Sequence, residues 1–164
     1  MTDVSIRSAE EQDGDGLWAI LQPVFAAGET YAIDPDIDRA GALAYWTGGK
    51  KKVFVAERGG GDLLGTYYLV RNQGGGGAHV CNCGFVTAAS AQGMGIARLM
   101  LEHAFGAAKE GGFAAMQFNF VISANTRAIN LWTRYGFDTV GRLPDAFFHP
   151  HEGYVDALVM YRKL

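Results

Sequence analysis

The sequence predicts a single α/β domain built on a twisted, mixed central sheet of about seven strands, with helices on both faces. Its 164 residues fit one domain, and about half of them are hydrophobic, which is enough for one sizeable core. Segments with the two-residue period of strands alternate with segments of helical period, and no segment is repeated. Strand hairpins stand beside crossover connections, which favours a mixed sheet.

The first half of the chain is predicted to form a strand, two helices and a hairpin. Apolar side chains recur at helical spacing before Gly28, a residue typical of a helix end. Pro23 lies inside this helix and predicts a bend or a restart, because proline lacks the N–H that a helix interior needs. The predicted ranges are 4–7 for the strand, 13–26 and 38–47 for the helices, and 52–57 and 63–71 for the hairpin.

The second half is predicted to alternate strands with two further helices. From Gly93 the apolar residues change to helical spacing, and the helix ends at Gly111. In the strand that follows, alternation places Met116, Phe118, Phe120 and Ile122 on one face. The other predicted elements are strands at 78–87, 115–122, 137–142 and 155–162, a helix at 126–135 and a long loop at 143–154.

Composition and charge narrow the possible functions. The formal net charge of −3 provides no broad basic field for nucleic acid or an anionic membrane. No apolar run reaches the length of a membrane helix, and the N-terminus does not resemble a signal peptide. Cys81 and Cys83 are the only cysteines and are expected to be buried, reduced thiols, which predicts a cytoplasmic protein. We expect no metal site, because His149 and His151 have no nearby carboxylate or cysteine ligands.

A glycine-containing turn between a strand and a helix carries the most specific chemical signal. Gly93 and Gly95 lack a Cβ, so the backbone there can approach an anion and present several N–H groups to it. The first N–H groups of the following helix are unsatisfied, and the helix dipole adds positive potential. A pyrophosphate suits such a site, although the same pattern also occurs in ordinary loops. The turn is neither a P-loop nor a dinucleotide-binding motif, since Arg98 stands at the third glycine position.

Two motifs resemble those of the GNAT (Gcn5-related N-acetyltransferase) superfamily. The first is Gln-Gly-Met-Gly-Ile-Ala at 92–97, and the second runs from Asn125 to Gly136-Phe137, with one strand between them. The resemblance implies that acetyl-CoA is the co-substrate and that its pantetheine arm lies between strands 78–87 and 115–122, which splay apart. The coenzyme-binding residues that it implies are Phe85, Val86, Gln92, Gly93, Met94, Gly95, Ile96, Ala97, Asn125 and Trp132.

A closer likeness is to the fungal N-acetyltransferases that act on L-azetidine-2-carboxylate and other proline analogues. It implies that Tyr31, Asn82 and Asn119 contact the acceptor, that the two asparagines belong with Asn125 to the catalytic constellation, and that the enzyme has a detoxifying role. Asparagine is disfavoured within strands, and a buried unpaired amide costs about 1–3 kcal/mol, so two of them on neighbouring strands favour a polar function over a purely structural bond. His149, in the loop 143–154, is expected to form part of the pocket wall.

The resemblance implies direct transfer in a ternary complex, in which the amine attacks the thioester. The base stays undecided among five candidates: Glu29, His79, His149, His151 and Asp156. Trp132 occupies the position where many superfamily members have an acidic tyrosine, and an indole cannot act as an ordinary acid. A protein N-terminal or lysine acetyltransferase and a non-catalytic acyl-CoA sensor remain alternatives to a small-molecule acetyltransferase. A homodimer is expected by resemblance alone.

Overall fold

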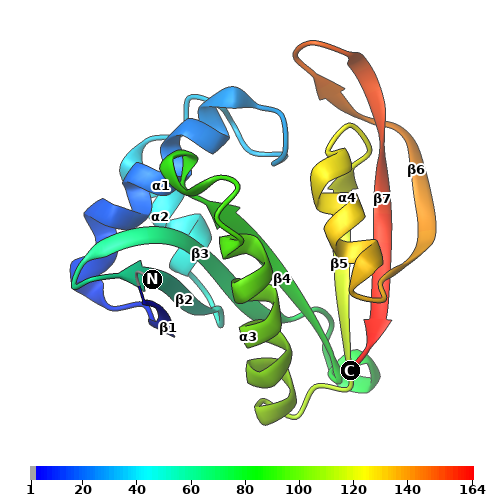
Figure 1. Cartoon of the computed structure of the whole chain (residues 1–164). Coiled ribbons are helices and arrows are strands. Elements are labelled where there is room, and N and C mark those ends of the chain that lie inside the picture. Colours follow the sequence, from blue (N-terminus) through cyan, green and yellow to red (C-terminus); the bar gives the residue numbers. More distant parts are fainter. Residues whose placement is uncertain (1–2) are drawn as a thin grey trace.

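The computed structural model describes residues 3–164, which form eleven helices and strands in the predicted order (Figure 1). Short 3₁₀ turns lie at Glu11–Asp13, Gly75–Gly77 and Ala89–Ala91. The strands are β1 (Val4–Ser8), β2 (Lys52–Arg58), β3 (Asp62–Arg71), β4 (Val80–Thr87), β5 (Ala115–Ile122), β6 (Asp138–His149) and β7 (Gly153–Lys163). The helices are α1 (Gly14–Ala27), α2 (Arg39–Thr47), α3 (Ile96–Glu110) and α4 (Thr126–Arg134).

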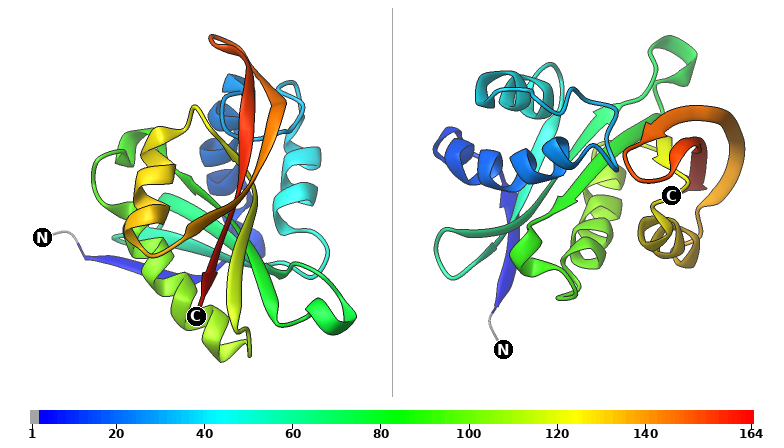
Figure 2. Two further views of the ribbon diagram at one scale, coloured as in Figure 1. Left: turned by 90° about the vertical axis from the view of Figure 1, so that its right-hand side faces the viewer. Right: turned by 90° about the horizontal axis from the view of Figure 1, so that it is seen from above.

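All seven strands form one sheet in the order β1-β2-β3-β4-β5-β7-β6. Every neighbouring pair is antiparallel except β4 and β5, which run parallel. The first two helices cover one face and the last two cover the other, as the left view of Figure 2 shows. The predicted fold class is therefore confirmed.

Adjacent residues of β3 show how the two faces are filled. Tyr67 points toward α3, where its hydroxyl lies 2.6 Å from Nδ1 of His103. Tyr68 points the other way and packs edge-on against Trp46 of α2, with ring centroids 4.8 Å apart. Both tyrosines are buried, so each face of the sheet carries its own layer of core.

The parallel strands β4 and β5 pair only over their first three residues. Val80, Cys81 and Asn82 face Ala115, Met116 and Gln117, and the pairing stops there. Beyond this point the strands diverge, as seen from the lower to the upper part of Figure 1. The predicted splay is confirmed, and it leaves the inner edges of both strands without ladder partners.

Three expectations about local structure are wrong. Helix α1 does not restart at Pro23: it runs without interruption from Gly14 to Ala27, and Gly28 follows with a left-handed φ of 63°. The predicted loop at 143–154 is instead a hairpin, because β6 extends to His149 and β7 begins at Gly153. The hairpin has one register shift between Thr139 and Gly141 and a second between Leu143 and Phe147, where Asp145 has a φ of 47°.

The third difference concerns β5, where Phe120 does not share the face of Met116 and Phe118. A bulge between Phe118 and Val121 inserts one extra residue opposite β7, so the alternation shifts by one position. Phe120 consequently has an exposed fraction of 37% and contacts Phe147 of β6. Strand alternation predicts faces correctly only as far as the last regular pair.

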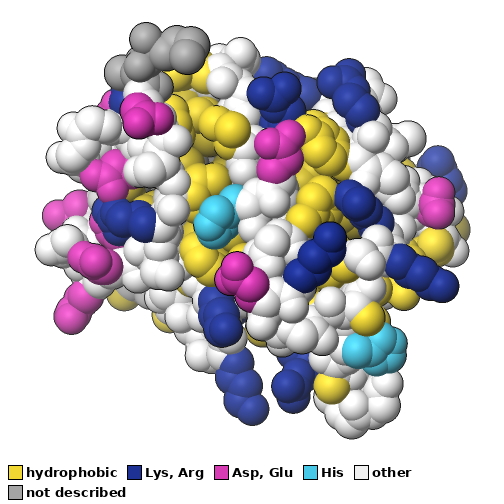
Figure 3. All heavy atoms as spheres, turned by 60° about the horizontal axis from the view of Figure 1, so that its bottom comes forward, with side chains coloured by type: hydrophobic (Ala, Val, Ile, Leu, Met, Phe, Trp, Pro, Cys, Tyr) yellow, Lys and Arg dark blue, Asp and Glu magenta, His cyan; other side chains and the backbone are white. Residues whose placement is uncertain are grey.

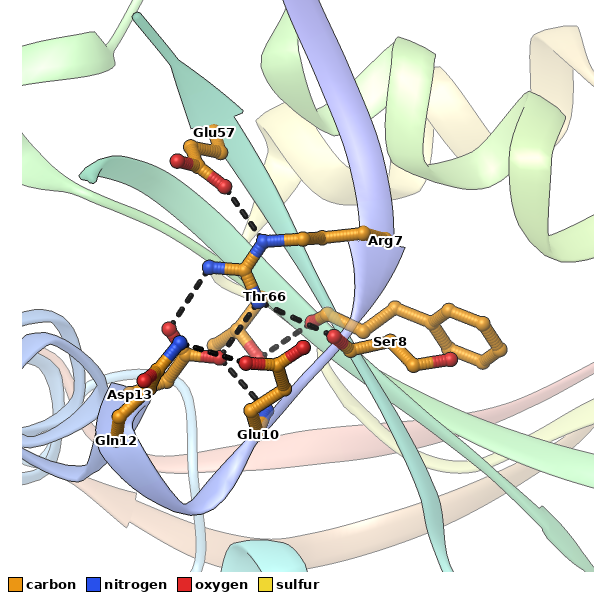
Figure 4. A network of polar contacts seen from close by, with 8 residues as sticks. Arg7, Ser8, Glu10, Gln12, Asp13, Glu57 and Thr66 are labelled. Carbon is orange, nitrogen blue, oxygen red and sulfur yellow. Dashed lines mark hydrogen bonds and ion pairs between the residues drawn. The ribbon is translucent and has the colours of Figure 1, made fainter. Parts of the chain in front are cut away.

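An ionic network far from the splay joins β1 to the start of α1 (Figure 4). Arg7 donates two hydrogen bonds to the carboxylate of Asp13, at 2.8 and 2.9 Å, and a third to Glu57 of β2 at 2.5 Å. Asp13 is buried, and its hydrogen bond with Arg7 holds the pKa of its carboxyl below the ordinary value. This network fixes the outer end of the sheet.

The surface carries both signs of charge. Figure 3 turns the bottom of the molecule, as drawn in Figure 1, toward the viewer. On this face acidic and basic side chains lie close together, with hydrophobic side chains between them. Within residues 3–164 no helix has the length and apolarity to cross a membrane.

Candidate active site

A groove of about 860 Å³ occupies the splay between β4 and β5. On the side of α3 and α4 it is lined by the glycine turn, the two helix N-termini and the aromatic side chains above them. On the side of α1 and α2 it is lined by tyrosines and by the amides of the strands. We call these two parts the α3–α4 half and the α1–α2 half of the groove. Their main lining residues are Gln92, Gly93, Gly95, Ile96, Ala97, Arg98, Asn125, Arg127, Trp132 and Arg134 in the first, and Thr30, Tyr31, Tyr45, Tyr68, Asn82, Gly84, Asn119 and Phe120 in the second.

The glycine turn has the geometry of an anion site. Gly93 and Gly95 have φ values of 80° and 76°, which other residues adopt only with strain, and a Cβ built on either meets no atom within 4 Å. The first helical hydrogen bond of α3 runs from the N–H of Leu99 to the carbonyl of Gly95 at 3.1 Å. The N–H groups of Ile96 and Ala97 precede that bond and face the open end of the helix, where the dipole is positive. Met94 belongs to this turn but is 44% exposed and is not among the groove-lining residues.

Three arginines that the sequence analysis missed line the same half of the groove. Arg98 belongs to the first turn of α3, and Arg127 and Arg134 belong to α4. The two arginines of α4 are seven residues apart and so lie on one helix face, a spacing that would have revealed them. Arg98 also approaches Glu102, at 3.9 Å, leaving its guanidinium largely exposed. The three guanidinium groups give this half of the groove a positive charge.

Trp132 is part of an aromatic wall and not a proton donor. Its ring lies 4.7 Å from Phe118 and 5.3 Å from Phe85, measured between centroids, and its exposed fraction is 7%. Tyr135, the other conceivable acid, donates its hydroxyl proton to Glu102 on α3 at 2.5 Å, which raises its pKa. Asn125 caps α4 by accepting a hydrogen bond from the N–H of Ala128 at 3.3 Å.

The hydrogen-bond ladder decides which backbone groups of β4 face the groove. At one end of β4 the carbonyl of Val80 accepts a hydrogen bond from the N–H of Asn72, just after β3, and beyond the other end the N–H of Ala88 donates to the carbonyl of Leu64 in β3. Between these two bonds β4 and β3 pair in register without a bulge. By alternation Val86 also bonds β3, whereas the N–H and C=O of Phe85 point into the splay. The hydroxyl of Tyr31 donates to that carbonyl of Phe85 at 3.1 Å. Of the two predicted backbone contacts, the one at Phe85 is thus exposed to a ligand and the one at Val86 is not.

Asn82 and Asn119 belong to a chain of amides at the point where the strands part. Nδ2 of Asn82 donates to the backbone carbonyl of Gln117 at 2.9 Å, bridging the last paired position. Asn119 accepts from Nε2 of Gln117 at 2.9 Å and donates to Oδ1 of Asn72 at 2.7 Å. Both predicted asparagines still line the groove, and these bonds fix their orientation. Asn72 and Gln117 were missed because their pairing depends on the register of three strands.

His149 lies away from the groove. Its Nδ1 accepts hydrogen bonds from the backbone N–H groups of His151 and Glu152, at 3.2 and 3.3 Å, and so closes the β6–β7 turn. The structure therefore does not bring it together with Tyr31 and the asparagines. Nε2 of His151 lies 3.2 Å from a carboxylate oxygen of Glu29, which links the hairpin tip to the segment after α1.

Asp156 also has a structural role. Its carboxylate accepts from the N–H of Asp145 at 3.0 Å and pairs with Arg142, which together hold its pKa below the ordinary value. No group of three or more potential metal ligands is found among residues 3–164.

Comparison with known proteins identifies the family. The model of the acetyltransferase (GNAT) family matches residues 16–137, which include the glycine turn, the splay and α4. The chain belongs to this family. It is therefore an acyltransferase of the N-acetyltransferase type.

Relatives of this GNAT protein include both enzymes and solved structures. A GCN5-related N-acetyltransferase from Kribbella flavida is 36% identical, with a TM-score of 0.93 and 98% of each chain covered. The N-acetyltransferase aca1 of Schizosaccharomyces pombe is 38% identical over 98 residues, which are 59% of this chain and 47% of that protein. The match thus spans about half the length of that relative. A phosphinothricin acetyltransferase from Sinorhizobium meliloti, solved in complex with AcCoA, shares the fold at 21% identity, with a TM-score of 0.85 and coverage of 100% of this chain and 89% of that one.

Proposed function

We propose that this GNAT protein transfers the acetyl group of acetyl-CoA to the amine of a small amino acid or amino-acid analogue. The observation that carries the proposal is the groove at the β4–β5 splay. It exposes unpaired strand backbone between an anion-binding helix terminus and a half lined by uncharged polar and aromatic groups. A GNAT fold that binds acetyl-CoA, as in the phosphinothricin acetyltransferase structure, supports the choice of co-substrate.

In this proposal the coenzyme occupies the α3–α4 half. The N–H groups at the start of α3 would receive the pyrophosphate, and Arg98, Arg127 and Arg134 would neutralise the remaining phosphate charge. The pantetheine amides would bond the inner edge of β4 at Phe85. Trp132 and Phe118 would pack against the arm from the side of α4.

The acetyl transfer then proceeds by direct attack. The nitrogen lone pair of the neutral amine forms a bond to the thioester carbonyl carbon, the C–S bond breaks, and the coenzyme leaves as a thiolate. The attacking nitrogen loses one proton to water, and the thiolate takes one from water, so the products are an amide and free coenzyme A. A backbone N–H of β4 that polarises the carbonyl oxygen would contribute about 3 kcal/mol, and positioning of the two reactants contributes further.

The acceptor in this proposal is of the proline-analogue type. Asn82, Asn119 and Tyr31 line the α1–α2 half and offer hydrogen bonds without net charge, which suits a zwitterion. The orientation of Asn119 is set by its bonds to Gln117 and Asn72, so its amide is pre-organised before the acceptor arrives.

The test is a free-thiol release assay with acetyl-CoA and a panel of amines. The panel holds L-azetidine-2-carboxylate, proline, a polyamine and N-terminal peptides, each with wild type, Asn119→Ala and the control Gln73→Ala, an exposed amide outside the groove. We expect release with the amino-acid analogues, a loss of at least tenfold in kcat/KM in Asn119→Ala, and no change in the control. Release with peptides alone would replace the small-molecule acceptor. Tight coenzyme binding without release on any amine would contradict catalysis and favour an acyl-CoA sensor.

We further propose that the protein is a homodimer through the β6 edge of the sheet. Val140, Leu143 and Phe148 of this edge strand have exposed fractions of 61%, 41% and 63%, which is unusual for three apolar side chains on one strand. Sedimentation of wild type and Phe148→Lys tests the proposal. A monomeric wild-type protein at micromolar concentration would contradict it.

A further inference from the structure

Tyr68 reaches the groove from β3 by crossing its neighbour β4. It pairs in register with Gly84, and a Cβ built on Gly84 would lie 2.5 Å from Cε1, 2.8 Å from Cζ and 3.0 Å from the hydroxyl oxygen of Tyr68. The ring therefore lies directly over the glycine, and only a residue without a side chain leaves room for it. Both residues line the groove.

The ring of Tyr68 packs against the ammonium group of Lys51, which does not itself line the groove. Nζ of Lys51 lies 4.7 Å from the Tyr68 ring centroid and 4.1 Å from that of Tyr45, and it also donates to the backbone carbonyl of Tyr45. Trp46 packs against Tyr68 from the side of α2. The two phenol rings thus separate one ammonium group from the groove, and their orientation is fixed by these contacts.

Within residues 3–164, no charged side chain lines the α1–α2 half of the groove. Among the groove-lining residues within 3–164, the charged side chains are the three arginines of α3 and α4, at the opposite end. Tyr31, which lines the same half, already uses its proton for the carbonyl of Phe85. Burial, together with the neighbouring Tyr45, raises the pKa of Tyr68, so its hydroxyl stays protonated and can donate.

We propose that Tyr45 and Tyr68, backed by the ammonium group of Lys51, form the subsite for the carboxylate of the acceptor. Phenol hydroxyls donate to a carboxylate, and the positive charge behind them favours an anion there over a neutral or cationic group. Asn82 lies two residues before Gly84 on β4, and so on the same face of the strand. With its carboxylate bound at Tyr45 and Tyr68, the acceptor would direct its amine toward the asparagines and the thioester. This inference rests on the proposed function and narrows it to acceptors with a free carboxylate.

The experiment compares L-azetidine-2-carboxylate with L-azetidine-2-carboxamide as acceptors for wild type, Tyr68→Phe and Lys51→Met. The measured quantity is kcat/KM for the acid divided by kcat/KM for the carboxamide. The two acceptors differ in amine basicity, but this difference affects every variant equally, so a change in the ratio between proteins reports on carboxylate recognition. We expect the acid to be preferred by wild type, the ratio to fall about tenfold in Tyr68→Phe, and to fall also in Lys51→Met. Tyr67→Phe is the matched control, since its hydroxyl lies on the other face of the sheet against His103, and it should leave the ratio unchanged.

The outcomes separate this inference from the proposed function. Equal losses for acid and carboxamide in Tyr68→Phe would show a merely structural role and overturn the carboxylate subsite, with acetyl transfer still standing. An unchanged ratio in both variants would overturn it as well. A wild-type protein that acetylates neither these acceptors nor any other amine would overturn the proposed function, and the subsite with it.

Discussion

At the scale of single residues, the neighbours Tyr67 and Tyr68 have the same chemistry but opposite surroundings. Tyr67 is fully buried, stacks on Phe54 with centroids 4.8 Å apart, and hydrogen-bonds His103 through its hydroxyl. Tyr68 is also buried, but it lines the groove. Strand alternation predicts that they face opposite ways, but it cannot tell which face holds the groove, since this depends on which helices cover each side.

The partly buried imidazole of His103 predicts a pH dependence of stability. Burial lowers the pKa of His103, and the smaller influence of Glu110 opposes the shift. As the pH falls below about 6.5, His103 therefore becomes protonated in the unfolded chain before it does so in the folded protein. Stability is lost between that pH and the lower pKa of His103 in the folded protein. We expect the free energy of unfolding, measured with urea between pH 8 and 5, to fall less steeply in His103→Gln than in wild type. Identical slopes would contradict the prediction, and Tyr67→Phe, which keeps the imidazole, should retain most of the slope.

At the scale of elements, the periodic patterns predicted every helix and strand in order, and the failures have specific physical causes. The end of β6 was predicted as a loop because Pro144 and Asp145 break the alternation. That irregular stretch is held by Asp156 and Arg142, which no local pattern pairs. Asn82 and Asn119 could be proposed as groove residues from their polarity within strands. Asn72, Tyr45 and Tyr68 could not, because the register of β3, β4 and β5 and the placement of α2 decide that they line or support the groove.

The Tyr68 ring, which lies directly over β4, makes Gly84 a sensitive position. Gly84→Ala would force the Tyr68 ring aside, and such overpacking typically costs about 1–3 kcal/mol in unfolding free energy. We also expect the KM for the acceptor to rise while the affinity for the coenzyme is retained. Gly76→Ala is the matched control, since a Cβ there meets no atom within 4 Å. In a double-mutant cycle with Tyr68→Ala the two losses should not add, because the second change removes the ring that the first displaces. Strict additivity would argue against the clash.

At the scale of the whole molecule, the groove divides the sheet into two parts that remain paired at one end only. The ladder of β1 to β4 and that of β5 to β7 are joined by three residue pairs, by the bond from Asn82 to Gln117 and by the bond from Asn119 to Asn72. The ionic network of Arg7 stabilises the β1 edge of the sheet and makes no contact across the β4–β5 splay. A coenzyme lying in the splay would contact both parts, so its binding should stabilise the fold as a whole.

Coenzyme binding is therefore expected to raise the melting temperature through the arginines of both helices. At a coenzyme concentration of a hundred times Kd, stabilisation should be about 2.7 kcal/mol. Replacing Arg127 and Arg134 by glutamine should weaken binding about tenfold or more and reduce its dependence on salt, because two charge-assisted contacts to phosphate are lost. Arg58→Gln is the control, since Arg58 pairs with Asp62 in the β2–β3 turn. Calorimetric titration with coenzyme A at two salt concentrations measures both effects. Unchanged affinity and salt dependence in the double variant would show that phosphate binding relies on α3 alone, through its N-terminus and Arg98.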